Sequence, residues 1–318
     1  MTIQHRTQPP KQRRQDLAAR VGKIWSKNWR LYLLVLPALT WLAVFMYAPL
    51  YGILIAFKDF KPRLGIMASP WAGLKYFEQF FSTNVAGNLI RNTLMLSAQQ
   101  LVFFFPVPII FALLLNQVTG RRYKKFIQTI SYAPYFVSNV VIVSIMMVIL
   151  APGGGFVNVL LQRLGSPPIF FMSMPEHFRP LYIASTVWQL MGFNAMIYIA
   201  ALTSISPDYY EAAMVDGALK YQRILHIDLP LIAPTIIIMF ILAVGNLMTL
   251  GYEKAFLMQS GMNLAVSEII STFVYKTGLV SAQFSFATAV GLFNSIVNFI
   301  LLVTTNFILR RVSDTSLF

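Results

Sequence analysis

The 318-residue chain contains no cysteine, which excludes a disulfide framework, a thiolate metal site and a cysteine nucleophile. Histidine is scarce as well, and His5, His177 and His226 lie in separate segments without the spacing of a metal-ligand set. The sequence has neither a G-x-S-x-G elbow for a serine nucleophile nor a G-x-x-x-x-G-K-[ST] phosphate loop. We therefore expect the chain to be neither an enzyme nor an ATP-binding subunit.

Charged residues are also few, whereas apolar residues are abundant. Charged residues make up 11% of the chain, hydrophobic residues make up 57%, and the mean hydropathy is +0.64, as is typical of a polytopic membrane protein. A helix needs about 20 apolar residues to cross a hydrocarbon core of ~30 Å. Uncharged runs of that length predict an all-α protein with six spans, at residues 31–57, 89–116, 126–150, 181–203, 231–251 and 284–309.

The central parts of these runs contain no Asp, Glu, Lys, Arg or His. Secondary carriers and pumps usually bind their coupling ion at an ionisable group near the middle of the membrane. The sequence thus argues against a stand-alone carrier, and the energy for uphill transport would come from another subunit. Amide side chains are present instead, and each either lines a path for hydroxyl-rich solutes or forms hydrogen bonds between helices.

Lysine and arginine predict the orientation of the spans. Sixteen of the 25 fall on one side if six spans alternate, in residues 1–30, 121–125, 220–223 and 310–311. The positive-inside rule assigns this side to the cytoplasm, together with both termini and the segment 204–230. The basic tail, residues 1–30, is expected to contain a short interfacial helix because apolar residues recur there at helical spacing, at Leu17, Val21, Ile24, Trp25 and Trp29.

The segment 204–230 is more charged than its apolar surroundings. Ser206 and Pro207 predict a helix start, and this helix should end near Val215. Gly217 then permits a sharp turn into a second short helix, which is expected to end at Leu229 and Pro230. The bent helix pair suits a socket on a soluble partner, although a connector held by its own chain has the same features.

The same segment resembles the EAA loop of ABC importer permeases. That family's pattern is Glu-Ala-Ala, then Asp-Gly-Ala, then Ile-x-Leu-Pro and a further Pro. The matching residues here are Glu211, Ala212, Ala213, Asp216, Gly217, Ala218, Ile227, Leu229, Pro230 and Pro234. Further stretches, such as WAGLKYFEQFF and FSFATAVGLFNSIVN, resemble the LplB-type carbohydrate branch over nearly the whole chain.

This resemblance implies a type I importer permease fold with cytoplasmic termini. Residues 204–230, called the EAA loop below, would dock on a cytoplasmic ATPase. Glu211 would make a polar contact there, Gly217 would allow the turn, and Ala212, Ala213, Ala218 and Leu225 would pack in the ATPase cleft, with Asp216 and Pro230 completing the motif. Asp228 stands where a small or hydroxylated residue is expected, which puts one local contact in doubt.

The resemblance also implies partners. A second permease would complete the pore, two ATPase subunits would use ATP and Mg²⁺, and an extracytoplasmic solute-binding protein would deliver the solute. No cofactor would bind to this chain, and no nucleic acid is implied. The family's usual place is the bacterial cytoplasmic membrane.

Oligosaccharides or polysaccharide fragments are the implied substrate. Sugars are held by aromatic faces and amide groups, so the candidate path residues are Gln99, Asn139, Trp188, Gln189, Asn194, Tyr198 and Asn246. Core packing and interfacial anchoring are the more common roles for any one of these residues. Nine basic residues, including Arg91 near the outer end of its span, against five acidic residues on the predicted outer side suit an acidic sugar or a binding-protein surface. A different solute class, a stand-alone carrier and an intramembrane enzyme are the alternatives.

Overall fold

The computed structural model describes residues 28–312. The interfacial helix expected in the tail therefore lies largely outside the described residues. The chain divides into two compact units, one ending at Leu54 and one beginning at Ile55, and each is described by itself.

The described part of the first unit, from Asn28 on, is one apolar helix. The helix runs from Asn28 to Phe57, and its end extends into the second unit. It is α-helical at first, widens to a π-helical turn over Ala43–Tyr47 (η1), and tightens to a 3₁₀ helix over Ala48–Phe57 (η2). Its 30 residues are long and apolar enough to cross a membrane.

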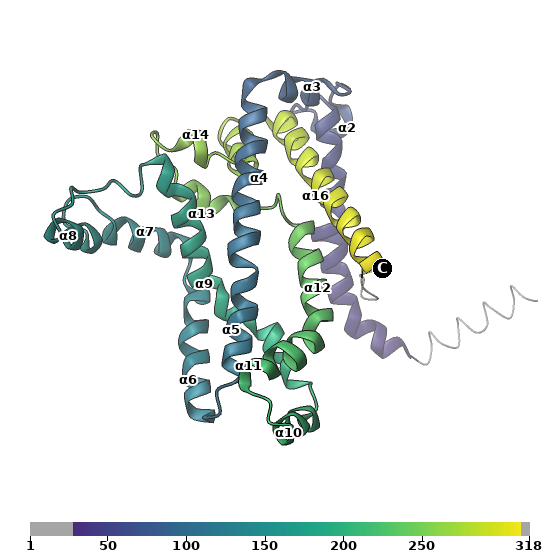
Figure 1. The fold of residues 1–318 in the computed structure, drawn as a ribbon. Helices are drawn as coiled ribbons and strands as arrows, with labels where there is room; N and C mark the ends of the chain where they lie inside the picture. Colours follow the sequence, from purple (N-terminus) through teal and green to yellow (C-terminus); the bar gives the residue numbers. More distant parts are fainter. Residues whose placement is uncertain (1–27, 313–318) are drawn as a thin grey trace, which may run out of the picture. The chain divides into compact units, whose positions relative to one another are not determined.

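The second unit is built around four further long helical segments. These are α4 (Asn84–Phe104) continued by α5 (Pro106–Asn116), α9 (Pro175–Thr203), α12 (Leu229–Gly245) and α16 (Phe284–Val312). In Figure 1, α10 (Pro207–Val215) and α11 (Lys220–Arg223) lie together at one end of this unit, and α2 (Gly65–Ala68) and α3 (Lys75–Ser82) lie at the other end. Each long segment satisfies the length and composition needed for a membrane span.

The region predicted as one straight span over 126–150 is bent. Helix α6 (Arg121–Tyr132), extended by the 3₁₀ turn η3 (Ala133–Phe136), meets α7 (Asn139–Ile149) at 97°. Pro134 lacks the N–H that would continue the α6 ladder, and Ser138 begins a new helix by accepting a hydrogen bond from Val141 N. The described residues thus contain five candidate spans, or six if this bent pair is one span.

Short helices connect the long ones. Helix α8 (Phe156–Arg163) follows α7, and the chain between α12 and α16 forms α13 (Tyr252–Leu257), α14 (Leu264–Ser267), α15 (Ile270–Tyr275) and the π-helical turn η5 (Lys276–Val280). Among the described residues the only strand-like pairing is an isolated bridge between Lys58 and Trp71.

The helices of the second unit pack closely at small residues. A Cβ atom on Gly192 of α9 would lie 2.1 Å from Ser131 O of α6, and one on Gly245 of α12 would lie 2.2 Å from Leu302 Cδ1 of α16. Such close approach without a side chain is a common way to join membrane helices. One buried cluster joins α5, α9 and α12, and it consists of Ile109, Ala112, Leu113, Ala195, Tyr198, Leu202 and Ile232.

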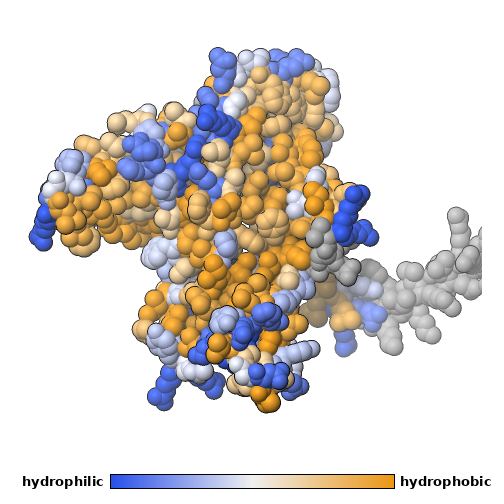
Figure 2. Space-filling model, in the orientation of Figure 1, coloured by the Kyte–Doolittle hydropathy of each residue, from blue (hydrophilic) through white to orange (hydrophobic). Residues whose placement is uncertain are grey.

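Apolar residues also cover much of the outside. Figure 2 shows a broad apolar face over the long helices, whereas hydrophilic residues gather around α10 and around α3. An apolar face between two polar ends is the pattern that a bilayer requires.

Candidate functional site

The first helix of the EAA loop is α10, and it begins and ends at signals visible in the sequence. The Ser206 side chain accepts a hydrogen bond from Asp208 N at 3.3 Å, and Pro207 occupies the first turn. At the other end, Ala218 N donates to Ala213 O and Gly217 N donates to Met214 O. With Gly217 at φ +74°, this is a Schellman motif, which only glycine adopts without strain. The turn between the two helices is therefore fixed in direction.

The second helix of the loop does not end at Leu229 and Pro230, contrary to the prediction. Residues Lys220–Gly245 form one continuous helix, in which α11 passes through the π-helical turn η4 (Ile224–Asp228) into α12. The extra residue of a π turn widens the backbone and accommodates Pro230, which has no N–H to donate. The EAA loop is consequently joined rigidly to a long apolar helix.

The predicted docking residues lie mostly on the surface. Glu211, Ala212, Asp216, Gly217, Leu225 and Pro230 are exposed, and Ala213 and Ala218 are half-buried. Ala213, Asp216, Gly217 and Ala218 line one shallow cavity of about 360 Å³, which Arg223 and His226 line from the second helix. The remaining predicted residues, Glu211, Ala212, Leu225 and Pro230, do not line this cavity. Leu225 is an exposed apolar side chain among polar groups. Protein-binding surfaces combine apolar and polar side chains in this way.

Asp228 connects the EAA loop to two other elements. Its side chain is fully buried, and its Oδ2 accepts a hydrogen bond from Gln117 Nε2 at 2.9 Å, just beyond the end of α5. Its Oδ1 accepts a hydrogen bond from the Tyr210 hydroxyl of α10. Burial, followed by the bond to Asp228, raises the pKa of Tyr210 to about 12, so the hydroxyl keeps its proton and remains a donor. Asp228 therefore joins three elements, which are η4, α10 and the end of α5. These contacts are called the Asp228 junction below.

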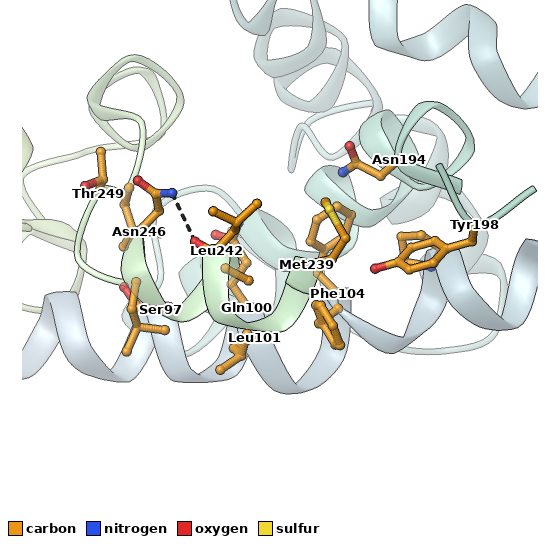
Figure 3. Close-up of a pocket in the computed structure, with 15 residues that line it drawn as sticks. Ser97, Gln100, Leu101, Phe104, Asn194, Tyr198, Met239, Leu242, Asn246 and Thr249 are labelled. Carbon is orange, nitrogen blue, oxygen red and sulfur yellow. Dashed lines mark hydrogen bonds between the residues drawn. The ribbon is translucent and has the colours of Figure 1, made fainter. Parts of the chain in front are cut away.

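Two cavities in the interior of the second unit bring together most of the predicted path residues. The first, called the amide cavity, has a volume of about 350 Å³ and is lined by Asn194, Tyr198 and Asn246, together with Gln100. Figure 3 shows Asn194 and Tyr198 on one side of this cavity and Asn246 on the other. Asn246 Nδ2 donates to Leu242 O at 3.0 Å, the bond drawn as a dashed line in Figure 3.

The second cavity, called the Lys254 cavity, has a volume of about 440 Å³. Two predicted path residues, Asn139 and Gln189, line it, as do Lys254 and Glu253 of α13. Gln100 lines both cavities, so they meet at this side chain. The two cavities therefore adjoin beside α4, α9 and α13.

Sequence reasoning selected the wrong neighbour on α4. Gln99 lines neither cavity, whereas Gln100 lines both. Adjacent helical residues point about 100° apart, so only one of the two amides borders the cavities, and composition alone does not identify which one. Trp188 also lies away from both cavities and is half exposed on α9. Lys254 and Glu253 were missed because they were assigned to an outer loop.

No group of three or more His, Asp or Glu side chains within residues 28–312 has the arrangement of a metal site. The chemistry of the two cavities is that of hydrogen bonding to a polar solute. Amide, hydroxyl and aromatic groups in a cavity of this size are typical of small-molecule sites.

Two known proteins are similar to the chain over nearly its whole length. The chain is 40% identical over 316 residues to protein LplB of Bacillus subtilis (strain 168), covering 98% of this chain and 99% of that protein. It is 42% identical over 288 residues to the polygalacturonan/rhamnogalacturonan transport system permease protein YteP of the same organism, covering 91% and 90% of the two chains.

A solved structure shares the fold. The chain superposes on a chain from the bacterial alginate ABC transporter in complex with its alginate pentasaccharide-bound periplasmic protein, with a TM-score of 0.86 and 36% identity, covering 94% of this chain and 100% of that one. The predicted all-α importer permease fold is therefore confirmed. Residues 105–314 match the family described as "Binding-protein-dependent transport system inner membrane component". The chain belongs to this family and is a membrane-embedded ABC transporter permease.

Proposed function

We propose that this chain is the permease subunit of an ATP-driven importer that takes up oligosaccharides or polysaccharide fragments delivered by a solute-binding protein. The observation that supports this most strongly is the EAA loop. It presents an exposed helix pair, fixes the angle between the helices at Gly217, and joins them rigidly to α12. A construction of this kind is able to transmit force from a separate motor to the membrane helices.

The EAA loop faces the cytoplasm in this proposal, as the distribution of basic residues predicts. Glu211 makes a polar contact with the ATPase, and Leu225 and the alanines pack in its cleft. When the ATPase dimer closes, the helix pair moves as a rigid body, and the Asp228 junction carries that movement to α5 and α12.

Four further subunits complete the transporter. A second, similar permease forms the other half of the pore, and two ATPase subunits hydrolyse ATP with Mg²⁺. This chain binds no cofactor and has no ATP site of its own. A solute-binding protein outside the cytoplasmic membrane delivers the sugar.

A saccharide passes through the Lys254 cavity and the amide cavity. Relatives support this substrate class, since one is named for polygalacturonan and rhamnogalacturonan and the similar solved structure is an alginate transporter. The proposed path contains Gln100 in place of Gln99, and Trp188 faces lipid or the second permease.

The test is purification of the tagged chain from its native membrane, followed by reconstitution in proteoliposomes. We expect an ATPase and a second permease to copurify, and ATP-dependent uptake of oligosaccharides bound by the matching solute-binding protein. The chain alone should show neither ATP hydrolysis nor ion-driven uptake. Ion-driven uptake by the chain alone would overturn the proposal, and ATP-driven uptake of non-sugars only would change the solute class.

A further inference from the structure

Lys254 is a buried cation without an anionic partner among residues 28–312. Its side chain is 5% exposed, and Nζ donates to Thr186 Oγ1 at 3.1 Å and to Gln189 Oε1 at 3.5 Å. The ring of Tyr182 lies 5.6 Å from Nζ. The ion pairs of the described residues do not include Lys254. A buried ammonium without an anionic partner lowers the stability of the fold. Buried charges of this kind are frequent at functional sites.

The neutral acceptors around Lys254 are themselves held in place. Gln189 Nε2 donates to Val137 O at 3.1 Å, so its Oε1 is turned toward the lysine. The Thr186 hydroxyl donates to Tyr182 O at 2.7 Å, which leaves its lone pairs for Nζ. These bonds orient the ammonium without neutralising its charge.

The cavity beside Lys254 offers acceptors for hydroxyl groups. Gln100 Oε1 is buried and has no hydrogen-bond partner. The carboxylate of Glu253 accepts a hydrogen bond from Asn139 Nδ2 at 2.6 Å and is otherwise exposed. A saccharide hydroxyl can donate to either acceptor, whereas Lys254 is the one positive charge among the described lining residues.

We infer that Lys254 binds a carboxylate of an acidic saccharide, such as a uronate, while the neighbouring hydroxyls of the sugar donate to Gln100 and Glu253. The inference rests on the proposed import of saccharides and specifies that the imported saccharide carries negative charge. A carboxylate accepts a charge-assisted hydrogen bond from Nζ, which is stronger than the bonds to Thr186 and Gln189. A neutral sugar leaves the ammonium without an anion.

The test is ATP-dependent uptake by the reconstituted transporter of trigalacturonate, of its fully methyl-esterified form and of maltotriose. Lys254→Gln should lower the uptake of trigalacturonate about tenfold or more, as expected for the loss of one charge-assisted hydrogen bond. The same variant should leave uptake of the ester or of maltotriose within about twofold, and Lys254→Arg should retain most uptake of the acid. Copurification of the ATPase serves as the control for folding.

A purely structural lysine gives a different result. If Lys254 only ties α13 to α9, Lys254→Gln and Thr186→Val will lower the uptake of charged and neutral sugars by equal factors, and the inference is wrong. Wild-type uptake of the neutral sugars alone also overturns the inference but leaves the proposed function intact. If the wild-type transporter takes up none of the three sugars, both the proposed import of saccharides and the inference are wrong.

Discussion

Asp228 and Lys254 are both almost fully buried and both form hydrogen bonds to neutral groups, yet only Lys254 borders a cavity. Both oxygens of Asp228 accept hydrogen bonds, from Gln117 and from Tyr210, and these donors come from two other parts of the fold. Lys254 has only neutral acceptors and borders a cavity. A buried charge whose hydrogen-bonding atoms are all satisfied by the chain joins elements, whereas one that borders a cavity is available to a ligand.

This comparison separates two kinds of defect. A change at the EAA loop or the Asp228 junction should impair transport of every solute by the same factor, because it affects the movement itself. A change in the Lys254 cavity should discriminate between solutes.

Gly217→Val should abolish ATP-driven uptake of all saccharides. A non-glycine residue at positive φ costs about 1–2 kcal/mol, and a β-branched side chain fits there especially poorly. Uptake into proteoliposomes and ATP hydrolysis stimulated by the loaded binding protein measure the loss. Gly165→Val is the matched control, since Gly165 has a φ of +83° in a loop after α8 and should tolerate the change without loss of uptake. Normal uptake by the Gly217 variant would refute the role of the turn.

Asp228→Ala should lower the thermal stability of the complex and the uptake of charged and neutral sugars equally. Its removal leaves the half-buried Gln117 amide and Tyr210 hydroxyl without this partner, at a cost of at most about 1–3 kcal/mol in the free energy of unfolding for each unsatisfied group. Tyr210→Phe removes one bond only and should show a smaller effect. The exposed Asp208→Ala, on the same helix as Tyr210, is the control. A loss confined to acidic sugars would contradict the distinction drawn above.

Gln100→Leu should reduce saccharide uptake several-fold, whereas Gln99→Leu should have little effect. The two variants introduce the same side chain at adjacent positions, but only Gln100 borders the cavities. The initial rate of uptake at several sugar concentrations measures the difference. Equal effects of both variants would show that the amides act in helix packing.

A rise of pH should reduce the uptake of acidic sugar selectively. Burial lowers the pKa of Lys254 to about 8, so its charge is present below this pH and is lost as the pH rises through it. The other titratable side chains at this cavity are Tyr135, Tyr182 and Glu253. We expect the ratio of trigalacturonate to maltotriose uptake to fall a few-fold between pH 7 and about pH 9. Lys254→Arg should remove this dependence, and a wild-type ratio that is constant over this range would contradict the assignment.

The sequence predicted the membrane helices and the EAA loop because their signals are local. Apolar length identifies a span, and Ser206, Pro207 and Gly217 set the ends of α10 through their own backbone chemistry. The 97° bend before α7 was missed, since Pro134 inside an apolar run fits either a kinked span or two helices. The continuous helix through Pro230 was missed because a π turn leaves no mark in composition.

The two buried charges could not be predicted for a different reason. The burial of Asp228 depends on Gln117, which is 111 positions away in the chain, and that of Lys254 depends on Thr186, 68 positions away. Local patterns contain no information on such contacts. The amide residues were recognised as candidates, but the three-dimensional structure was needed to separate Gln100 from Gln99.

The central claim is that the EAA loop is held by a separate ATPase. Because the chain lacks cysteine, Leu225→Cys introduces a single thiol on the exposed side of the loop, and Trp188→Cys places one on an exposed side chain of α9 as a control. In the purified transporter, a short thiol-to-amine cross-linker should join the Leu225→Cys variant to the ATPase in high yield and should join the Trp188→Cys variant to no ATPase. Cross-links from the thiol of the Leu225→Cys variant to its own chain alone would contradict the account.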